Sequence, residues 1–191
     1  MTAPWMDVFF WALVAATGLY TGMAVFTARR RFSRRTYMAA GIAASLGYLG
    51  PRALIPFLPQ PALGLPPALA LPLGGALLLL GVGILARVVV RLRAAARQPD
   101  GQGRPPIYDD GLYGVVRHPM YLGDILWGLG LAVALDAAYA AALTPLWWLL
   151  RAGLSVHEEE RLVDKYGEAY RAYCERVPAR ILPPLGGLLR R

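Results

Sequence analysis

The sequence has very few of the residues that build disulfides and metal sites. Of its 191 residues one is a cysteine, Cys174, and two are histidines, His118 and His157. A single cysteine excludes a disulfide within the chain, and the histidines do not stand at the paired spacing that a structural zinc site requires. We therefore expect no metal ion in this protein.

Charged residues are also scarce, and acidic ones most of all. They make up 17% of the chain, with 12 acidic against 20 basic side chains, whereas 57% of the residues are hydrophobic and the mean hydropathy is +0.42. A soluble domain of this size does not need so much apolar surface, so the composition predicts a helical membrane protein. The basic residues flank apolar segments and form no basic face, which indicates membrane orientation and excludes nucleic acid as a partner.

Three long apolar segments fill the N-terminal half, at residues 4–28, 37–58 and 69–90. Each is long enough to cross a hydrocarbon core of about 30 Å. Five arginines between positions 29 and 35 follow the first segment and predict a cytoplasmic loop, with the N-terminus outside. In the second segment, glycine and proline predict a break or kink near Pro51, which would place Arg52 near the outer face.

The C-terminal half is predicted to form a helical hairpin and one more helix. Apolar residues at 120–135 and 138–154 are separated by a turn at Asp136. From Ser155 the pattern becomes amphipathic, and Ser155 with Glu158 has the spacing of a capping box. The predicted fold is an all-α polytopic membrane protein, with about five transmembrane helices and a C-terminal cytoplasmic amphipathic helix.

These segments are expected to form a single integral-membrane domain. Residues 1–92 would be a three-span part, and residues 93–191 the part that carries the chemistry. Because the basic loops face the cytoplasm, we expect the protein in the cell (inner) membrane, with its C-terminus and its site on the cytoplasmic side.

Two polar stretches, residues 111–124 and 157–173, hold nearly all the side chains that could do chemistry. The predicted hairpin returns both to one membrane face and joins six of them: Arg117, His118, Tyr121, Glu158, Glu159 and Tyr166. Asp124 would lie inside the membrane, where a carboxylate is costly unless it faces a polar cavity or a partner. Taken separately, each stretch also fits an ordinary helix start, and the tyrosines also fit a packing stripe.

Together these side chains offer cations for a carboxylate, carboxylates for an amine and aromatic faces for a cation. S-adenosylmethionine presents all three groups. No glycine-rich Rossmann loop is available to hold it, which excludes a methyltransferase of the soluble type.

The motifs in the two stretches follow a known order. Residues 111–113 read Gly-Leu-Tyr, 117–123 read Arg-His-Pro-Met-Tyr-Leu-Gly, and 158–173 read Glu-Glu-x-x-Leu-x-x-x-Tyr-Gly-x-x-Tyr-x-x-Tyr before Val177-Pro178. With Tyr166 in place of a phenylalanine, this pattern resembles the integral-membrane methyltransferases typified by isoprenylcysteine carboxyl methyltransferase and the phospholipid methyltransferases. The resemblance covers about residues 111–183.

The resemblance implies S-adenosylmethionine as cofactor and methyl transfer to a lipophilic acceptor, an isoprenylcysteine-type carboxylate or a lipid head group. Glu158 or Glu159 would bind the cofactor amine or order the pocket, and Arg117 or Arg171 would orient an anionic acceptor. A carboxylate acceptor needs no general base, whereas an amine acceptor does, with Glu159 or His118 as the candidate. The remaining implied cofactor contacts are Tyr113, His118, Pro119, Tyr121, Leu122 and Tyr166.

A second resemblance keeps another activity open. Gly123-Asp124, Tyr166-Gly167 and residues 173–181 also resemble the C-terminal part of the membrane sterol reductases, which use NADPH. Those enzymes carry Arg-His-x-Asn-Tyr-x-Gly-Asp, whereas the asparagine is missing here and five spans are too few. A non-enzymatic membrane subunit is a third interpretation. Prenylcysteine, a phospholipid amine, a small thiol and another lipophilic acid all remain possible methyl acceptors.

Overall fold

The computed structural model describes residues 11, 14–15, 17–18, 22, 48–95, 97 and 106–183. In this part of the chain the secondary structure is helical apart from an isolated bridge between Ala62 and Ala137. The helices are η2 (Ile55–Phe57), α3 (Pro67–Ala95), η3 (Gly111–Gly114), α4 (Pro119–Ala134), α5 (Ala138–Ala142), α6 (Thr144–Tyr166) and α7 (Glu168–Arg176). The all-α prediction is therefore confirmed for the described residues.

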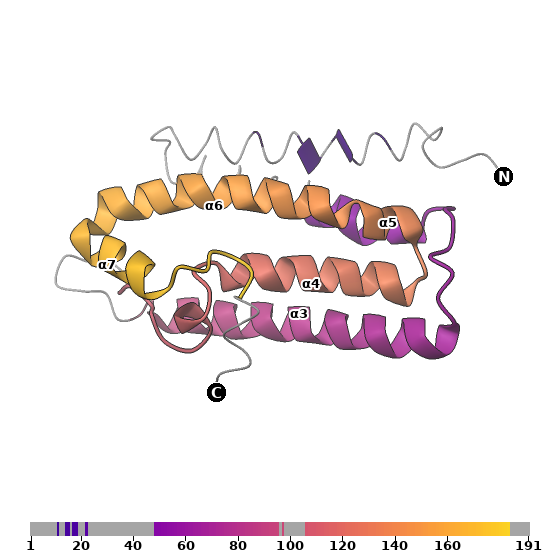
Figure 1. Ribbon diagram of the computed structural model, residues 1–191, viewed down its shortest axis with the longest axis horizontal. Coiled ribbons are helices and arrows are strands. Elements are labelled where there is room, and N and C mark those ends of the chain that lie inside the picture. The colour runs from indigo at the N-terminus through magenta and orange to yellow at the C-terminus, as the bar shows by residue number, and fades with distance from the viewer. Residues whose placement is uncertain are drawn as a thin grey trace.

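Three long helices, α3, α4 and α6, run with nearly parallel axes, and the chain reverses direction from each to the next (Figure 1). At one end of this arrangement α3 ends, α4 begins and α6 passes into α7 (Figure 1). Both polar stretches of the sequence therefore lie at the same end of the bundle.

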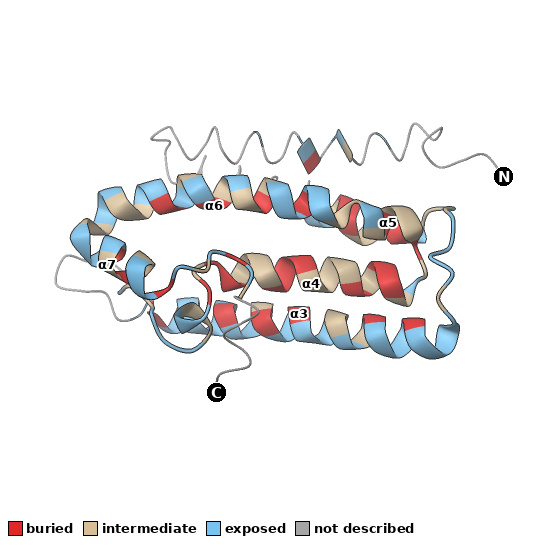
Figure 2. Cartoon of the chain, in the orientation of Figure 1, coloured by how far each residue is buried: buried red, intermediate tan, exposed pale blue. Residues whose placement is uncertain are grey.

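α3 is the one helix in the described part of the chain that is long and apolar enough to cross a membrane. Its 29 residues give a length of about 43 Å at 1.5 Å per residue. It contains the predicted span 69–90 and has no charged side chain before Arg87. The face of α3 turned away from α4 is exposed along its length (Figure 2), and its leucines there are suited to contact with lipid.

α3 and α4 pack through glycines that let their backbones approach closely. A Cβ atom on Gly81 would lie 2.4 Å from the backbone nitrogen of Trp127, and one on Gly130 would lie 2.3 Å from that of Leu78. Both distances are far below van der Waals contact, so neither position can hold a larger residue without moving the helices apart. Small residues play this role in helix pairs of membrane proteins.

The turn between α4 and α5 forms at Asp136, as predicted. Asp136 has a φ of 54°, and its carbonyl accepts a hydrogen bond from the N–H of Leu63 at 3.1 Å. The N–H of Ala138 donates to the carbonyl of Pro61 at 3.0 Å. The connector before α3 is thus tied to the far end of the bundle, opposite the polar stretches.

The prediction of a separate amphipathic helix starting at Ser155 is wrong. α6 runs without interruption from Thr144 to Tyr166, and the Ser155 hydroxyl donates to the carbonyl of Ala152 inside the helix and caps nothing. The break comes later, at Gly167, whose φ of 60° ends α6 and starts α7. The amphipathic pattern that begins at Ser155 reflects a change in the surroundings of a single continuous helix. It does not mark the start of a new helix.

The second predicted span is described only from residue 48 onward. Of the first span, residues 11, 14–15, 17–18 and 22 are described and are helical, whereas the arginine loop that follows it lies outside the described residues. Residues 48–54 are helical through Pro51, and the helix changes to η2 only at Ile55. Arg52, predicted near the outer face, is 3% exposed and paired with Asp124. Its place relative to the membrane stays a prediction, whereas its pairing with a residue 72 positions away was not predicted, because no local pattern reveals it.

Candidate functional site

Backbone hydrogen bonds hold the first polar stretch in place. The N–H of Arg117 donates to the carbonyl of Ala179 at 2.9 Å, and the N–H of His118 donates to that of Arg180 at 2.8 Å. α4 then starts at Pro119, whose missing N–H suits a first helical turn. Arg117 and His118 are therefore clamped between α4 and the segment that follows α7.

Glu159 is the centre of a charge cluster, which we call the Glu159 cluster (Arg117, His118, Glu159 and Arg180). Its carboxylate accepts from Nε of Arg117 at 2.8 Å and from Nε of Arg180 at 3.0 Å, and it faces Nε2 of His118 at 3.0 Å. Burial favours the neutral acid, but the hydrogen bonds from His118 and Arg117 outweigh it and lower the pKa of Glu159 to about 2. Glu159 is ionised at neutral pH.

Arg117 is fully engaged. Its Nε and Nη2 atoms face the Glu159 carboxylate, and Nη1 donates to the carbonyls of Val177 at 2.7 Å and Pro178 at 3.0 Å. All three nitrogens therefore have partners within the protein. The side chain ties the start of α4 to α6 and to the segment after α7.

His118 lies between two carboxylates. Its Nε2 is 3.0 Å from Glu159, and its Nδ1 is 3.4 Å from Oε2 of Glu158. Burial favours the neutral ring, yet the hydrogen bonds to Glu158 and Glu159 outweigh it and raise the pKa of His118. Because both ring nitrogens face acceptors, the doubly protonated ring satisfies both.

Glu158 is the exposed member of the glutamate pair. Its side chain is 50% exposed, and Oε2 accepts from the Tyr121 hydroxyl at 2.8 Å. The Tyr121 ring stacks on the His118 ring, with 5.3 Å between centroids and 8° between planes. A carboxylate can accept more hydrogen bonds than these, so Glu158 has capacity left for a ligand.

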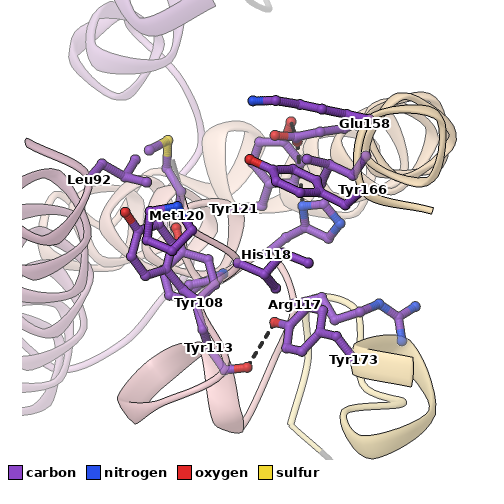
Figure 3. A pocket seen from close by; sticks show the side chains of 15 residues that line it. Leu92, Tyr108, Tyr113, Arg117, His118, Met120, Tyr121, Glu158, Tyr166 and Tyr173 are labelled. Atoms are coloured by element: carbon purple, nitrogen blue, oxygen red, sulfur yellow. Dashed lines mark hydrogen bonds and ion pairs between the residues drawn. The ribbon is translucent and has the colours of Figure 1, made fainter. Parts of the chain in front are cut away.

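Next to these side chains lies a cavity of about 340 Å³, which we call the tyrosine-lined cavity (Figure 3). Five tyrosine rings contribute to its wall: Tyr108, Tyr113, Tyr121, Tyr166 and Tyr173. Apolar side chains from α3, α4 and α6 complete it, with Leu92 and Met120 on one side and Glu158 on another (Figure 3). The cavity thus combines aromatic faces, an apolar wall and one half-exposed carboxylate.

Most of the residues that the sequence assigned to the site border this cavity. Seven of them line it: Tyr113, Arg117, His118, Pro119, Tyr121, Glu158 and Tyr166. Leu122 is outside the lining, and Glu159 lies behind His118 as its hydrogen-bond partner. Arg171 is also outside, exposed on α7 and paired with Glu168 at 3.2 Å.

Sequence reasoning missed several lining residues, among them Tyr108 and Lys165. Tyr108 stands in the loop before η3, and its hydroxyl is buried without a hydrogen-bond partner among the described residues. Lys165 lies with its Nζ 4.8 Å from the ring centre of Tyr166. The aromatic ring of Tyr108 just ahead of the Gly-Leu-Tyr motif was a usable signal, whereas nothing in the sequence separates Lys165 from other charged positions of α6.

A second charge cluster lies deeper, between α4, α6 and the helix at residues 48–54. In this Asp124 cluster, the Asp124 carboxylate accepts from Tyr48 at 2.8 Å and Arg151 at 2.8 Å and lies 2.9 Å from Nη1 of Arg52. Trp127 donates to its other oxygen at 3.0 Å. The partner that an intramembrane carboxylate requires is therefore present twice.

No group of three or more His, Cys, Asp or Glu side chains that could hold a metal ion occurs within residues 48–95 and 106–183 or at the few N-terminal positions described. Charged side chains at the site pair with one another and leave the aromatic cavity as the place where a ligand fits. A membrane-length helix with such a cavity at one end of its bundle indicates a helical membrane protein with a candidate ligand site.

The chain belongs to the family described as "Protein of unknown function (DUF1295)", whose model matches residues 70–177. A segment of 89 residues is 38% identical to the Delta(14)-sterol reductase TM7SF2 of Mus musculus, covering 44% of this chain and 21% of that protein.

Two other relatives carry the name of a methyltransferase. Over 73 residues the chain is 36% identical to the Protein-S-isoprenylcysteine O-methyltransferase of Schizosaccharomyces pombe and 33% identical to Protein-S-isoprenylcysteine O-methyltransferase B of Arabidopsis thaliana. The matches cover 38% of this chain in each case, and 31% and 37% of those proteins. The chain thus spans between about a fifth and somewhat over a third of these relatives, and no solved structure matches it.

Proposed function

We propose that this protein transfers a methyl group from S-adenosylmethionine to a lipophilic acceptor at a membrane surface. The tyrosine-lined cavity, with Glu158 at its edge, is the observation that carries the proposal. Aromatic faces attract a sulfonium, and a carboxylate with free lone pairs accepts from an ammonium group. The names of the Schizosaccharomyces pombe and Arabidopsis thaliana relatives support the same activity.

The residues present fit the cofactor. Glu158 would receive its amine, and the rings of Tyr113, Tyr121 and Tyr166 would surround its cationic centre. The Tyr108 hydroxyl, buried and unpartnered among the described residues, would donate to a polar group of the ligand. Bound here, S-adenosylmethionine would supply an electrophilic methyl group.

The size and charge of the cavity favour this cofactor over NADPH. About 340 Å³ lies near the lower end of the range of about 300–1,000 Å³ for ligand sites, which suits one nucleoside better than a dinucleotide. The lining cations are Arg117, His118 and Lys165. Glutamates already face the first two, which leaves little positive charge for the phosphates of NADPH.

Within this proposal the chain contributes binding and alignment. Glu159, with its pKa lowered to about 2, is a poor base, and the raised pKa of His118 between two carboxylates favours the protonated ring, which has no lone pair to accept a proton. We therefore favour an acceptor that needs no deprotonation, such as an isoprenylcysteine-type carboxylate. The apolar wall at Leu92 and Met120 would exclude water and align the acceptor with the methyl group.

The resemblance implies that Arg117 or Arg171 orients the acceptor and that Glu159 is a candidate base, which makes these three the expected catalytic residues; we propose different roles for them. Arg117 and Glu159 would hold His118 and the start of α4 in position. Arg171 has a surface partner, so we propose Lys165 as the cation that meets an anionic acceptor. Among the described lining residues, Leu92 comes from the part at 1–92 and the others come from residues 93–191.

NADPH-dependent reduction is the second candidate, because the mouse relative is a sterol reductase and Gly123-Asp124 matches the motif of that group. Asp124, however, is 3% exposed and held by two arginines, and it does not line the cavity. Under the reductase proposal Asp124 would have to exchange these partners for a ligand.

Calorimetric titration of the purified protein in mild detergent tests the proposal, with S-adenosylmethionine and NADPH in parallel. We expect micromolar binding of S-adenosylmethionine alone. Glu158→Gln should weaken it by roughly ten- to a hundredfold, because a hydrogen bond to a charged group contributes about 1.5–3 kcal/mol. Glu160→Gln, on the exposed side of α6, is the matched control. Binding of NADPH alone would replace the proposal by the reductase.

A further inference from the structure

Arg151 is the side chain that contacts both the Asp124 cluster and the wall of the tyrosine-lined cavity. Its Nε donates to Oδ2 of Asp124 at 2.8 Å. The central carbon of its guanidinium lies 3.9 Å from the ring centre of Tyr48 and 4.9 Å from that of Tyr121. Tyr48 is buried beside Asp124, whereas Tyr121 lines the cavity. Arg151 therefore spans the two.

Tyr121 connects Arg151 with the cavity, because it contacts Arg151 and also lines the cavity. Its ring stacks on His118 and its hydroxyl donates to Glu158 at 2.8 Å. A ring held by both Arg151 and His118 has few orientations open to it, so the hydroxyl meets Glu158 from one direction. Glu158 in turn is the half-exposed carboxylate at the edge of the cavity. Supporting side chains that lock a binding residue in this way improve its alignment with a ligand.

The Asp124 cluster holds two arginines against one carboxylate. Arg151 contacts that carboxylate through Nε at 2.8 Å, whereas Arg52 contacts Asp124 twice, with Nη1 2.9 Å from the carboxylate and Nη2 donating to the Asp124 carbonyl at 3.0 Å. A buried ion pair is balanced at one charge to one, and a second buried arginine adds desolvation cost. Its position against Tyr121 gives a reason for its presence.

We propose that Arg151 is a positioning residue: it holds the Tyr121 ring, and through the Tyr121 hydroxyl the Glu158 carboxylate, in the orientation that receives the cationic group of the ligand. The identity of that ligand rests on the proposed function. The contact between Arg151 and Tyr121 is independent of it, because it lies within the protein.

Arg52 provides a matched control. It shares the Asp124 cluster, but its guanidinium stacks near Tyr48, Trp127 and Trp147, none of which lines the cavity. Arg151→Met and Arg52→Met each leave Asp124 with one arginine, so both variants keep a balanced pair and both are expected to fold. Only Arg151→Met removes the contact with Tyr121.

Titration in detergent compares the two variants for S-adenosylmethionine. We expect Arg151→Met to raise the Kd about tenfold, which corresponds to about 1.4 kcal/mol, because the Tyr121 ring loses the cation that holds it. Arg52→Met should stay within about twofold of the unmodified protein. Arg151→Lys, which keeps the charge but not the planar stack, should fall between them. Equal losses in both methionine variants, or no loss in Arg151→Met, would overturn the inference.

A second readout does not need the ligand. In protein labelled with 3-fluorotyrosine, the ¹⁹F resonance of Tyr121 can be assigned by its disappearance in Tyr121→Phe. Arg151→Met should move this resonance and Arg52→Met should not. If the unmodified protein binds no S-adenosylmethionine, the proposed function fails and the resonance alone decides about Arg151. An unmoved resonance refutes the positioning role even where binding is normal, and Arg151→Lys carries the same readout if Arg151→Met does not fold.

Discussion

Asp124 and Glu159 are each paired with two arginines, yet the two clusters hold different parts of the molecule together. The partners of Asp124 are Arg52 and Arg151, which lie on helical segments. The partners of Glu159 are Arg117 and Arg180, which lie on two irregular segments that are hydrogen-bonded to each other. The same ion-pair chemistry thus fixes helix to helix in the interior and loops to a helix at the site.

The two clusters also differ in their access to water. The side chains of Arg52 and Asp124 are 1% and 4% exposed, whereas Arg180 in the Glu159 cluster is 46% exposed. When a buried charge loses its partner, nothing replaces it, and the cost is several kilocalories per mole. At the Glu159 cluster, water can hydrate part of what a substitution leaves unpaired. We therefore expect the interior cluster to dominate stability and the outer one to dominate ligand binding.

Asp124→Asn should have the largest effect, because it leaves Arg52 and Arg151 buried without a counter-charge. We expect a loss of about 3–5 kcal/mol in the free energy of unfolding. Denaturation in detergent would measure it, with the exposed Asp164→Asn on α6 as the control. If Asp124→Asn lost less free energy of unfolding than Glu159→Gln, the Asp124 cluster would not be the one that dominates stability.

Glu159→Gln comes next. The amide keeps the shape of the side chain but no longer balances Arg117, Arg180 and His118, so we expect a loss of about 1–3 kcal/mol. Binding of S-adenosylmethionine should fall as well, because His118 loses one of the carboxylates that hold it, and His118→Ala should show the same loss of binding. Both variants should still fold in detergent. Near-normal affinity in both would separate the Glu159 cluster from the ligand site.

Dependence on pH sharpens the contrast further, because the Glu159 cluster contains a histidine. The pKa of Glu159 is lowered to about 2, so its stabilising contribution is present above its ordinary pKa of 4.5 and is lost as the pH falls toward 2. The pKa of His118 is raised above 6.5, so its contribution is present below pH 6.5 and is lost as the pH rises through the raised pKa.

Together, these two shifts predict that the Glu159 cluster stabilises the fold most between about pH 4.5 and 6.5. Unfolding in detergent from pH 6 to 9 should show a loss of stability that His118→Gln abolishes. The other histidine, His157, lies on α6 and gives the matched control His157→Gln. An unchanged pH profile in His118→Gln would show that His118 carries no extra proton in the folded protein.

Arg171→Gln should have the smallest effect. Arg171 is 61% exposed and pairs with Glu168 one turn away on α7, so it belongs to neither cluster. We expect less than about 0.5 kcal/mol in unfolding and no change in ligand affinity. A large loss of ligand affinity in Arg171→Gln would support the original prediction that Arg171 binds the acceptor.

Local sequence patterns were enough to predict much of the fold. The apolar run of α3, the start of α4 near Pro119 and the turn at Asp136 follow from hydrophobic length and from proline chemistry. The same patterns failed at Ser155, because a helix that leaves an apolar environment changes its composition without having to end. They also gave no sign that Arg52 is buried against Asp124, since a local pattern does not show which distant residue an arginine contacts.

For the candidate site too, the sequence predicted some features and could not predict others. The sequence predicted Tyr113, His118, Tyr121, Glu158 and Tyr166, all of which line the cavity. It did not separate Glu158 at the cavity from Glu159 behind His118, because adjacent residues on a helix point about 100° apart and only the packing decides which side faces the ligand.

Sequence alone therefore determined the helical class, the membrane-length helix and the two polar stretches that meet at one end of the bundle. Each of these depends on residues close together in the chain. Only the tertiary structure decided that Arg52 pairs with Asp124, that Arg151 reaches Tyr121, and that Tyr108 joins the cavity wall. Those are contacts between distant segments, and charge pairing inside a bundle depends on which helix faces come together, which the pattern within one helix does not specify.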